Sequence, residues 1–252
     1  MLYCEDVTVQ SYIFYLGRFT KWLDSDNFDL LTKQTLRDYI YSLRYRMKNT
    51  SIATNYRPVK AFCKWLYQED YLEKDITIGV KLPKKDAAIV EPLTALEVKQ
   101  IDDTIINKSV NKHIALRNYC IFHLLLDCGL RRQEVCHLQV HHLDPERNIL
   151  HIVNSKENKS RFVLIPDFLI SALQEYDQRT GITSGYMLRQ LRDPERPLTS
   201  NTVKMIFQDL KISTGIDRLH AHLLRHTFAI SYLIGGGNLE FLRVFLGHYD
   251  YA

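Results

Sequence analysis

The sequence predicts a mainly helical protein with one small β-hairpin, divided into two domains. Three observations support this prediction. Apolar residues recur at three- and four-residue steps through much of the chain, which is the spacing of amphipathic helices. This periodicity is lost between Lys81 and Pro92. Two β-rich runs, Ile149 to Val153 and Arg161 to Ile165, surround a polar turn that holds Lys156 and Lys159, as in a hairpin.

Three amphipathic helices are expected in the first domain. Their apolar positions are Tyr12, Tyr15, Leu16, Phe19, Trp22 and Leu23, then Leu36, Tyr39, Ile40, Leu43 and Met47, and then Val59, Phe62, Cys63 and Leu66. Pro58 falls inside the third pattern. It is expected to kink that helix or to mark its start, because proline lacks the helical donor and crowds the preceding turn.

The first domain also carries a one-sided cluster of positive charge. The segment from Leu31 to Tyr67 contains eight basic residues and one acidic residue, Asp38, which gives a local excess of seven positive charges. They are Lys33, Arg37, Arg44, Arg46, Lys48, Arg57, Lys60 and Lys64, and we call them the basic stripe. Such a stripe suits a polyphosphate partner, although a solvated helix face would also produce it.

The segment KLPKKDAAIVEP, from Lys81 to Pro92, is typical of an extended linker because it concentrates lysine and is bracketed by prolines. We place the domain boundary near Asp86, which gives domains of residues 1–86 and 87–252. The second domain opens with a helix that Thr94 can cap, with Glu97 completing a capping box.

The central helix of the second domain is expected to be the apolar stretch CIFHLLLDC, from Cys120 to Cys128, which Gly129 stops. His123 within it is interpreted as a core histidine with satisfied hydrogen bonds. Helices dominate again after Pro166, and the glycines at 235–237 separate the last two.

Composition excludes several classes of protein. The N-terminal sequence carries Glu5 and Asp6 where a signal peptide needs positive charge, and no apolar run is long enough to span a bilayer. A cytoplasmic location without membrane association is expected. The five cysteines are widely spread with no CxxC pair, so they are interpreted as free, buried thiols. The net charge of +4 is only mildly basic and does not by itself indicate a nucleic-acid partner.

Five side chains of the second domain are donors suited to phosphate: Arg131, Lys156, His222, Arg225 and His248. Two guanidiniums can clamp the nonbridging oxygens of a phosphodiester and oppose the charge of the transition state. A nearby lysine or histidine can then protonate the leaving alkoxide. No group of acids at metal-ligand spacing accompanies these residues, so metal-assisted phosphoryl chemistry is the weaker alternative.

Each signal has an ordinary explanation when it is taken alone. Arg131 and Glu134 could form a surface helix pair. The string HLLRH places His222, Arg225 and His226 on neighbouring helical positions, which could serve a solvated face or a metal site. A metal site is the minor interpretation because the spacing provides no third ligand.

The order of these motifs along the chain argues against the ordinary explanation of each one. The string DCGLRRQEVCHLQVHHLD, a downstream hairpin lysine, HLLRHTFA and then FLGH resemble the active-site boxes of the phage-integrase (Xer-like) tyrosine recombinases. TVQSYIFYLGRFTKWL and TNYRPVKAFCKWL resemble the first and last helices of that family's core-binding domain. The resemblance implies a helical, SAM-like core-binding domain followed by an α+β catalytic domain.

The resemblance also implies roles for individual residues. Arg131 corresponds to the first catalytic arginine, with Arg132 as the weaker choice, and Glu134 to the acidic residue that holds this arginine. His222 corresponds to the histidine that assists proton transfer, and Arg225 to the second clamping arginine. His248 corresponds to the final phosphate-binding imidazole.

The hairpin lysine is the position where the sequence departs from the family pattern. Lys156 corresponds to the lysine that protonates the leaving 5′ oxygen, but Ser155 and Glu157 replace the glycines that usually flank it. Lys159 therefore stays open as an alternative. Together with the basic stripe, Lys159 is also an expected DNA contact.

The attacking tyrosine of the family lies further beyond the Leu-Gly-His histidine than this sequence extends. The sequence ends at Ala252, four residues past His248. Tyr249 and Tyr251 are too close to His248 to take that place and are interpreted as packing residues. We therefore expect this chain to bind DNA without cleaving it, either because the sequence is truncated or because the tyrosine was lost.

The resemblance implies a site-specific DNA recombinase that works through a 3′-phosphotyrosyl intermediate, without a metal or nucleotide cofactor. Its partner would be double-stranded DNA, on which the complete enzyme forms a tetramer, whereas this chain would be a monomer or weak oligomer. Two alternatives remain open: a noncatalytic DNA-binding regulator on a recombinase scaffold, and an enzyme resembling type IB topoisomerases.

Overall fold

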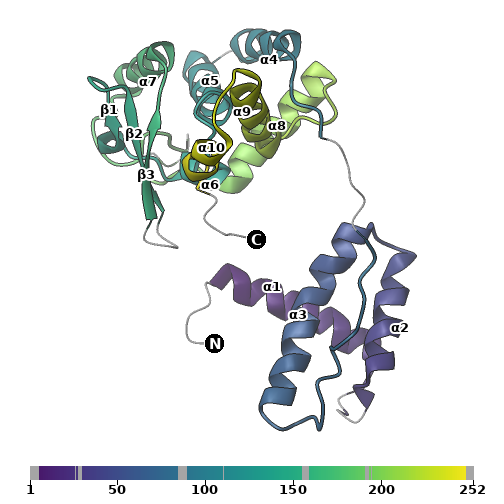
Figure 1. Ribbon diagram of the computed structural model, residues 1–252. Coiled ribbons are helices and arrows are strands. Elements are labelled where there is room, and N and C mark those ends of the chain that lie inside the picture. Colours follow the sequence, from purple (N-terminus) through teal and green to yellow (C-terminus); the bar gives the residue numbers. More distant parts are fainter. Residues whose placement is uncertain are drawn as a thin grey trace. The chain divides into compact units, whose positions relative to one another are not determined.

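The computed structural model of the chain describes residues 6–25, 27, 30–84, 90–109, 111–154, 159–190, 193 and 195–247. The chain divides into two compact units, Met1–Ile89 and Val90–Ala252, coloured purple to blue and teal to yellow in Figure 1. The sequence placed the boundary near Asp86, a residue outside the described ranges.

Unit 1 is helical, as predicted. Its helices are α1 (Asp6–Leu23), α2 (Lys33–Arg44) and α3 (Asn49–Gln68). They pack around a core that includes Phe19, Leu36 and Tyr39, each no more than 1% exposed. Pro58 lies inside α3 and is buried, so the expectation that it might mark the start of this helix is wrong. The helix begins nine residues earlier because Ile52, Tyr56 and Val59 all pack into the same core.

Unit 2 surrounds a central helix, α5 (Lys112–Leu126), that contacts α4, α7 and α9 (Figure 1). Its other elements are α4 (Ala95–Lys108), α6 (Arg132–Cys136), the 3-10 turn η2 (Val140–His142), β1 (Leu143–Asp144), β2 (Ile149–Asn154), β3 (Lys159–Leu164), α7 (Asp167–Thr180), α8 (Ser200–Thr214), α9 (Ala221–Ile234) and α10 (Leu239–Phe245). The predicted capping box is confirmed, because the Thr94 hydroxyl accepts from the Glu97 N–H and the Glu97 carboxylate accepts from the Thr94 N–H.

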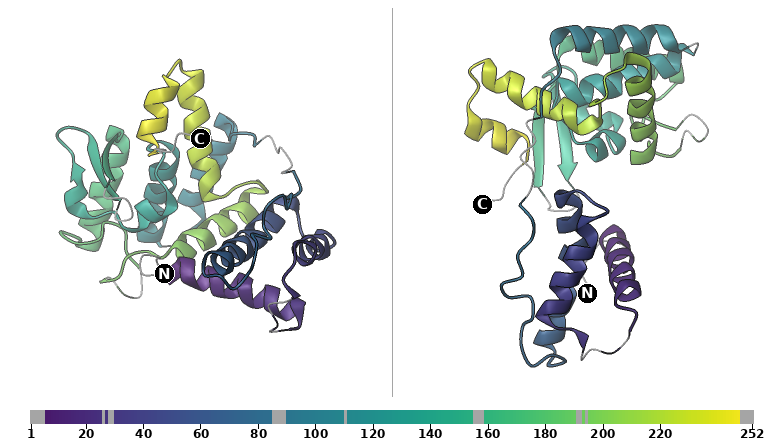
Figure 2. Two further views of the ribbon diagram at one scale, coloured as in Figure 1. Left: turned by 60° about the horizontal axis from the view of Figure 1, so that its bottom comes forward. Right: turned by 90° about the vertical axis from the view of Figure 1, so that its right-hand side faces the viewer.

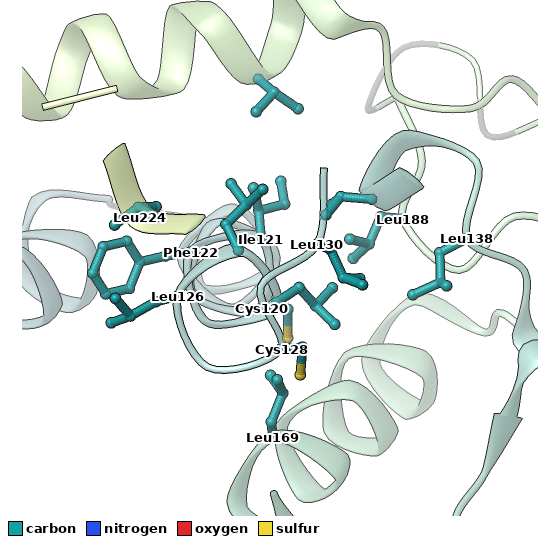
Figure 3. Packing of buried hydrophobic residues seen from close by; sticks show 14 of the residues in the cluster. Cys120, Ile121, Phe122, Leu126, Cys128, Leu130, Leu138, Leu169, Leu188 and Leu224 are labelled. Atoms are coloured by element: carbon teal, nitrogen blue, oxygen red, sulfur yellow. The ribbon is translucent and has the colours of Figure 1, made fainter. Parts of the chain in front are cut away.

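The core of unit 2 forms around α5 (Figure 3). Cys120, Ile121 and Phe122 are fully buried there, and Leu130 and Leu224 close around them. Cys63, Cys120, Cys128 and Cys136 are free and buried, which confirms the interpretation of these four as packing thiols. Cys4 lies outside the described residues.

The predicted hairpin is confirmed as β2 and β3, and β1 adds a third antiparallel strand that the sequence did not predict. In this register Arg161 is paired with Ile152, and Val163 with Leu150. Paired residues share one face of a sheet. Because Ile152, Val163 and Leu150 are buried, Arg161 belongs to the inner, apolar face.

The last two helices form a pair beside the sheet (Figure 2). A glycine-containing turn at 235–237 separates α9 from α10, as predicted. Helix α10 contacts both α9 and β3. This contact brings Gly247, which follows α10, next to Arg161 of the hairpin.

Candidate active site

Arg131 is positioned by the turn between α5 and α6. Gly129 takes a left-handed conformation with φ of 59°, which glycine adopts without steric cost, and the chain then enters α6 with Arg131 as its N-cap. The Arg131 N–H donates to Glu134 Oε2 at 2.6 Å, and its Nη1 donates to Glu134 Oε1 at 3.1 Å. Its Nη2 donates to the Gly247 carbonyl at 2.8 Å. The Arg131 side chain remains 38% exposed.

Arg225, on α9, approaches the same place from the interior. It is 4% exposed, and its Nη1 donates to the Gly129 carbonyl at 2.5 Å. Its Nη2 donates to the carbonyl of Leu246. The two arginines therefore bond to the carbonyls of consecutive residues at the end of α10, so the fold does bring Arg131 and Arg225 together.

Positive charge is concentrated here. Burial, followed by the charge of Arg131, lowers the pKa of Arg225 to about 10, with Arg161 adding to the effect and Glu134 opposing it. Glu134 is the only carboxylate, among the described residues, that hydrogen-bonds to Arg131 or Arg161. Three guanidiniums and one carboxylate leave a net charge of about +2, which favours an anion.

Arg161 is a member of this cluster that sequence reasoning missed. It donates to both oxygens of Glu134, at 2.7 and 2.8 Å. A signal was present, since strand alternation places Arg161 on the same face as the apolar residues Val163 and Ile165. A charge on the buried face of a strand requires a partner.

His222, at the start of α9, lines a cavity of about 610 Å³ together with Arg131 and Arg225. Burial and the charge of Arg225 lower the pKa of His222 below its ordinary value. The imidazole is therefore neutral at neutral pH and can accept a proton. The cavity is also lined by Lys204 and Lys211 of α8, two cations that sequence reasoning did not select.

Several predicted site residues are not placed. Lys156 and His248 lie outside the described residues, as do Tyr249 and Tyr251. Lys159 is the first residue of β3, and its side chain is also outside the described part.

The basic stripe lies on two helices of unit 1 and on the turn between them. Arg57, Lys60 and Lys64 are spaced three and four residues apart on α3, so they share one exposed face, opposite the buried Val59 and Cys63. On α2, Lys33 is half-buried and Arg37 and Arg44 are exposed; Arg46 and Lys48 are exposed on the turn.

The hydrogen bonds of Thr77 and the charges of Lys64 and Lys60 hold the pKa of Asp75 below its ordinary value.

His123 is confirmed as a core histidine. Its Nδ1 lies 2.6 Å from Asp127 Oδ2 and its Nε2 lies 3.0 Å from Asp102 Oδ1. Within the described ranges no group of three or more His, Cys, Asp or Glu side chains could hold a metal ion. None of the helices described there has the length and apolar character to cross a bilayer.

A cationic cavity with clamped guanidiniums and a neutral imidazole is suited to phosphoryl transfer. Residues 91–252 match the model of the phage integrase family. The chain therefore belongs to the phage integrase family.

Relatives by sequence are tyrosine recombinases. The chain is 27% identical over 254 residues to tyrosine recombinase XerC of Bacillus pumilus (strain SAFR-032), covering 96% of this chain and 82% of the relative. It is 26% identical over 242 residues to tyrosine recombinase XerA of Thermococcus onnurineus (strain NA1), covering 96% of this chain and 80% of the relative.

Solved structures share the fold. The Tn1549 transposon integrase in complex with transposon right end DNA is similar with a TM-score of 0.82 and 17% identity, covering 98% of this chain and 87% of that one. The XerH site-specific recombinase bound to palindromic difH substrate has a TM-score of 0.81 and 16% identity, with coverage of 97% and 74%.

Proposed function

We propose that this protein is a site-specific DNA recombinase whose second unit holds a scissile DNA phosphate between Arg131 and Arg225. Membership of the phage integrase family supports the class of reaction. One observation carries the assignment of the site: two arginines from different helices bond to the carbonyls of Leu246 and Gly247 and line one cavity with His222.

In this proposal each residue of the cavity has a separate chemical task. The two guanidiniums oppose the charge that develops on the nonbridging oxygens. In a mechanism with a 3′-phosphotyrosyl intermediate, the neutral His222 accepts the proton of the attacking tyrosine hydroxyl. Lys156, with Lys159 as the alternative, donates a proton to the leaving 5′ oxygen, and His248 contributes a further donor to the phosphate.

The division of labour between the units is part of the same proposal. Residues 1–86 form the core-binding domain, which contacts duplex DNA through the basic stripe, and residues 87–252 form the catalytic domain. Action on DNA would place the protein in the cytoplasm. Contacts of the basic stripe would be mainly to backbone phosphates. Each such contact contributes about −0.9 to the slope of log affinity against log salt concentration. Affinity that stayed flat between low and physiological salt would refute this footprint.

The test uses protein expressed from its complete gene and a DNA site selected from a random pool. A nicked duplex of that site traps a covalent protein–DNA adduct if the strand is cleaved. Arg131→Ala is expected to slow adduct formation by about 100- to 1,000-fold, the typical effect of losing one oxyanion donor, with a much smaller effect on binding. Arg132→Ala is made alongside it, because Arg132 is exposed, lines the same cavity and is the weaker choice for the first catalytic arginine. A loss of adduct formation as large as that of Arg131→Ala would assign the clamp to Arg132 instead.

The possible outcomes separate the candidate functions. Equal losses of cleavage and binding would make Arg131 a backbone contact only. Tight, specific binding without any adduct would favour the noncatalytic regulator. Nicking and relaxation of supercoiled DNA without strand exchange would favour the topoisomerase-like enzyme.

A further inference from the structure

The contact between Arg161 and Glu134 joins two elements that are distant in sequence. Arg161 extends from the inner face of β3, and Glu134 lies on α6. The two terminal nitrogens of Arg161 donate to the two carboxylate oxygens of Glu134 at 2.7 and 2.8 Å. This bidentate geometry fixes the plane of the carboxylate as well as its distance. Both side chains are only 9% exposed.

The same carboxylate holds Arg131. Glu134 Oε2 accepts from the Arg131 N–H at 2.6 Å, and Glu134 Oε1 accepts from Arg131 Nη1 at 3.1 Å. Each oxygen of Glu134 is thus shared between Arg161 and Arg131. The orientation of the more exposed Arg131 therefore depends on a carboxylate whose plane is set by Arg161.

The electrostatics of Glu134 support this order of dependence. Burial alone would raise the pKa of this carboxyl, but the hydrogen bonds and charge of Arg161, followed by those of Arg131, bring it below its ordinary value. Arg161 thus contributes more than Arg131 to keeping Glu134 ionised. Without Arg161, the buried carboxylate would keep only the hydrogen bonds from Arg131, among those of the described residues.

Arg161 itself is not positioned to touch DNA. It is absent from the lining of the cavity that contains Arg131, His222 and Arg225, and its side chain is nearly covered. Any effect of Arg161 on a phosphate in this cavity therefore passes through its neighbours, either by the hydrogen bonds to Glu134 that orient Arg131 or by its charge, which also lowers the pKa of Arg225.

We infer that Arg161 is a positioning residue: it fixes the Glu134 carboxylate so that Arg131 presents its guanidinium to the scissile phosphate. This inference rests on the proposed function, because it requires Arg131 to hold a phosphate. It assigns to β3 a role separate from that of the lysine-bearing turn.

The experiment measures binding rather than cleavage, so it reports directly on the contact between Arg131 and the phosphate. The chain is bound to a selected DNA site in which one phosphate at a time is replaced by an uncharged methylphosphonate. A clamped phosphate should appear as a position where this replacement weakens binding by about 10- to 100-fold, the loss of one charge-assisted hydrogen bond. Arg131→Ala should reduce the penalty at that position to the part that Arg225 contributes and leave the others unchanged.

Arg161→Ala is expected to reduce the penalty at the same position towards its value in Arg131→Ala, while penalties elsewhere in the site are kept. Arg161→Lys retains the charge but lacks the two parallel donors of a guanidinium, so the methylphosphonate penalty in this variant should be intermediate. Arg179→Ala is the matched control, because Arg179 forms an exposed ion pair with Glu175 on α7. It should keep the full penalty.

A double-mutant cycle covers the case in which Arg161→Ala disturbs folding. Glu134→Gln should reproduce the loss, and adding Arg161→Lys to it should cause no further loss if both act through one carboxylate. Additive losses would overturn the inference, as would a full penalty in Arg161→Ala or Arg161→Lys. If no position in the site responds specifically to Arg131→Ala, the proposed phosphate clamp itself fails, and this result is distinct from a failure at Arg161.

Discussion

Replacing Arg225 by methionine tests whether the cationic cluster is kept for function at the expense of stability. Arg225 is 4% exposed and donates two hydrogen bonds to backbone carbonyls, those of Gly129 and Leu246. Hydrogen bonds from a charged donor contribute about 1.5–3 kcal/mol each. The substitution therefore removes about 3–6 kcal/mol of favourable interaction.

A second effect opposes this loss. Burial and the charges of Arg131 and Arg161 lower the pKa of Arg225 from 12.5 to about 10. Because one pKa unit corresponds to about 1.4 kcal/mol, this repulsion and desolvation cost about 3 kcal/mol at neutral pH. The uncharged methionine relieves that cost, so we expect Arg225→Met to lower the free energy of unfolding by only about 0–3 kcal/mol.

Urea unfolding followed by two signals gives a controlled measurement. The two tryptophans of the chain, Trp22 and Trp65, lie on α1 and α3, so tryptophan fluorescence reports unit 1. Far-ultraviolet circular dichroism reports the helices of both units. Arg225→Met should shift the circular dichroism transition of unit 2 slightly and leave the fluorescence transition unchanged.

Two results would refute this reasoning. A loss above about 4 kcal/mol would show that the carbonyl hydrogen bonds dominate and that the like charges matter little. An increase in stability would show that desolvation and the like charges outweigh the carbonyl hydrogen bonds. In either case DNA binding at the clamped phosphate should fall, because the guanidinium is gone.

Two further predictions concern the core of unit 2. Burial alone would lower the pKa of His123, but the hydrogen bonds of Asp102 and Asp127 raise it to about 9, above about 6.5 in the unfolded chain. The contribution of His123 to the free energy of unfolding is therefore complete below about pH 6.5 and is lost as pH rises through 9. The urea midpoint should fall over that window in the wild type and much less in His123→Leu. Gly129→Ala should cost about 2 kcal/mol or more, because the alanine would hold a φ of 59° and its Cβ would lie 2.6 Å from the Phe228 ring. Gly181→Ala is the control, since it has a φ of 70° but nothing within 4 Å; equal losses in the two variants would exclude the steric contact with Phe228.

The parts of the fold that were predictable from sequence are those set by local periodicity and capping. The helices of unit 1, the Thr94–Glu97 cap and the hairpin follow from residues close together in the chain. The two-residue strand β1 carries no such signal, because it forms by pairing Leu143 with Leu150 and Asp144 with Ile149 of β2. The position of Pro58 inside α3 also depends on tertiary packing, which overrides the local cost of proline.

The candidate site shows the same division. Sequence order selected Arg131, Glu134 and Arg225, and the structure brings these three together. Sequence reasoning treated Arg161 as part of a β-rich run, because the partner that explains it lies 27 positions earlier on another element. Lys204 and Lys211 were missed for a related reason, since helical spacing alone does not say which face of α8 borders the cavity.

The charge balance of the site links its stability to its proposed activity. Glu134 neutralises only one of the three guanidiniums around it, and the charges of Arg131 and Arg161 add to the effect of burial in lowering the pKa of Arg225. A second buried carboxylate would relieve the repulsion, but it would also compete with a phosphate for the same donors. One carboxylate held by Arg161 orients Arg131 and still leaves the cluster positive. The arrangement therefore favours an incoming DNA phosphate through the same interactions that make the unoccupied fold less stable.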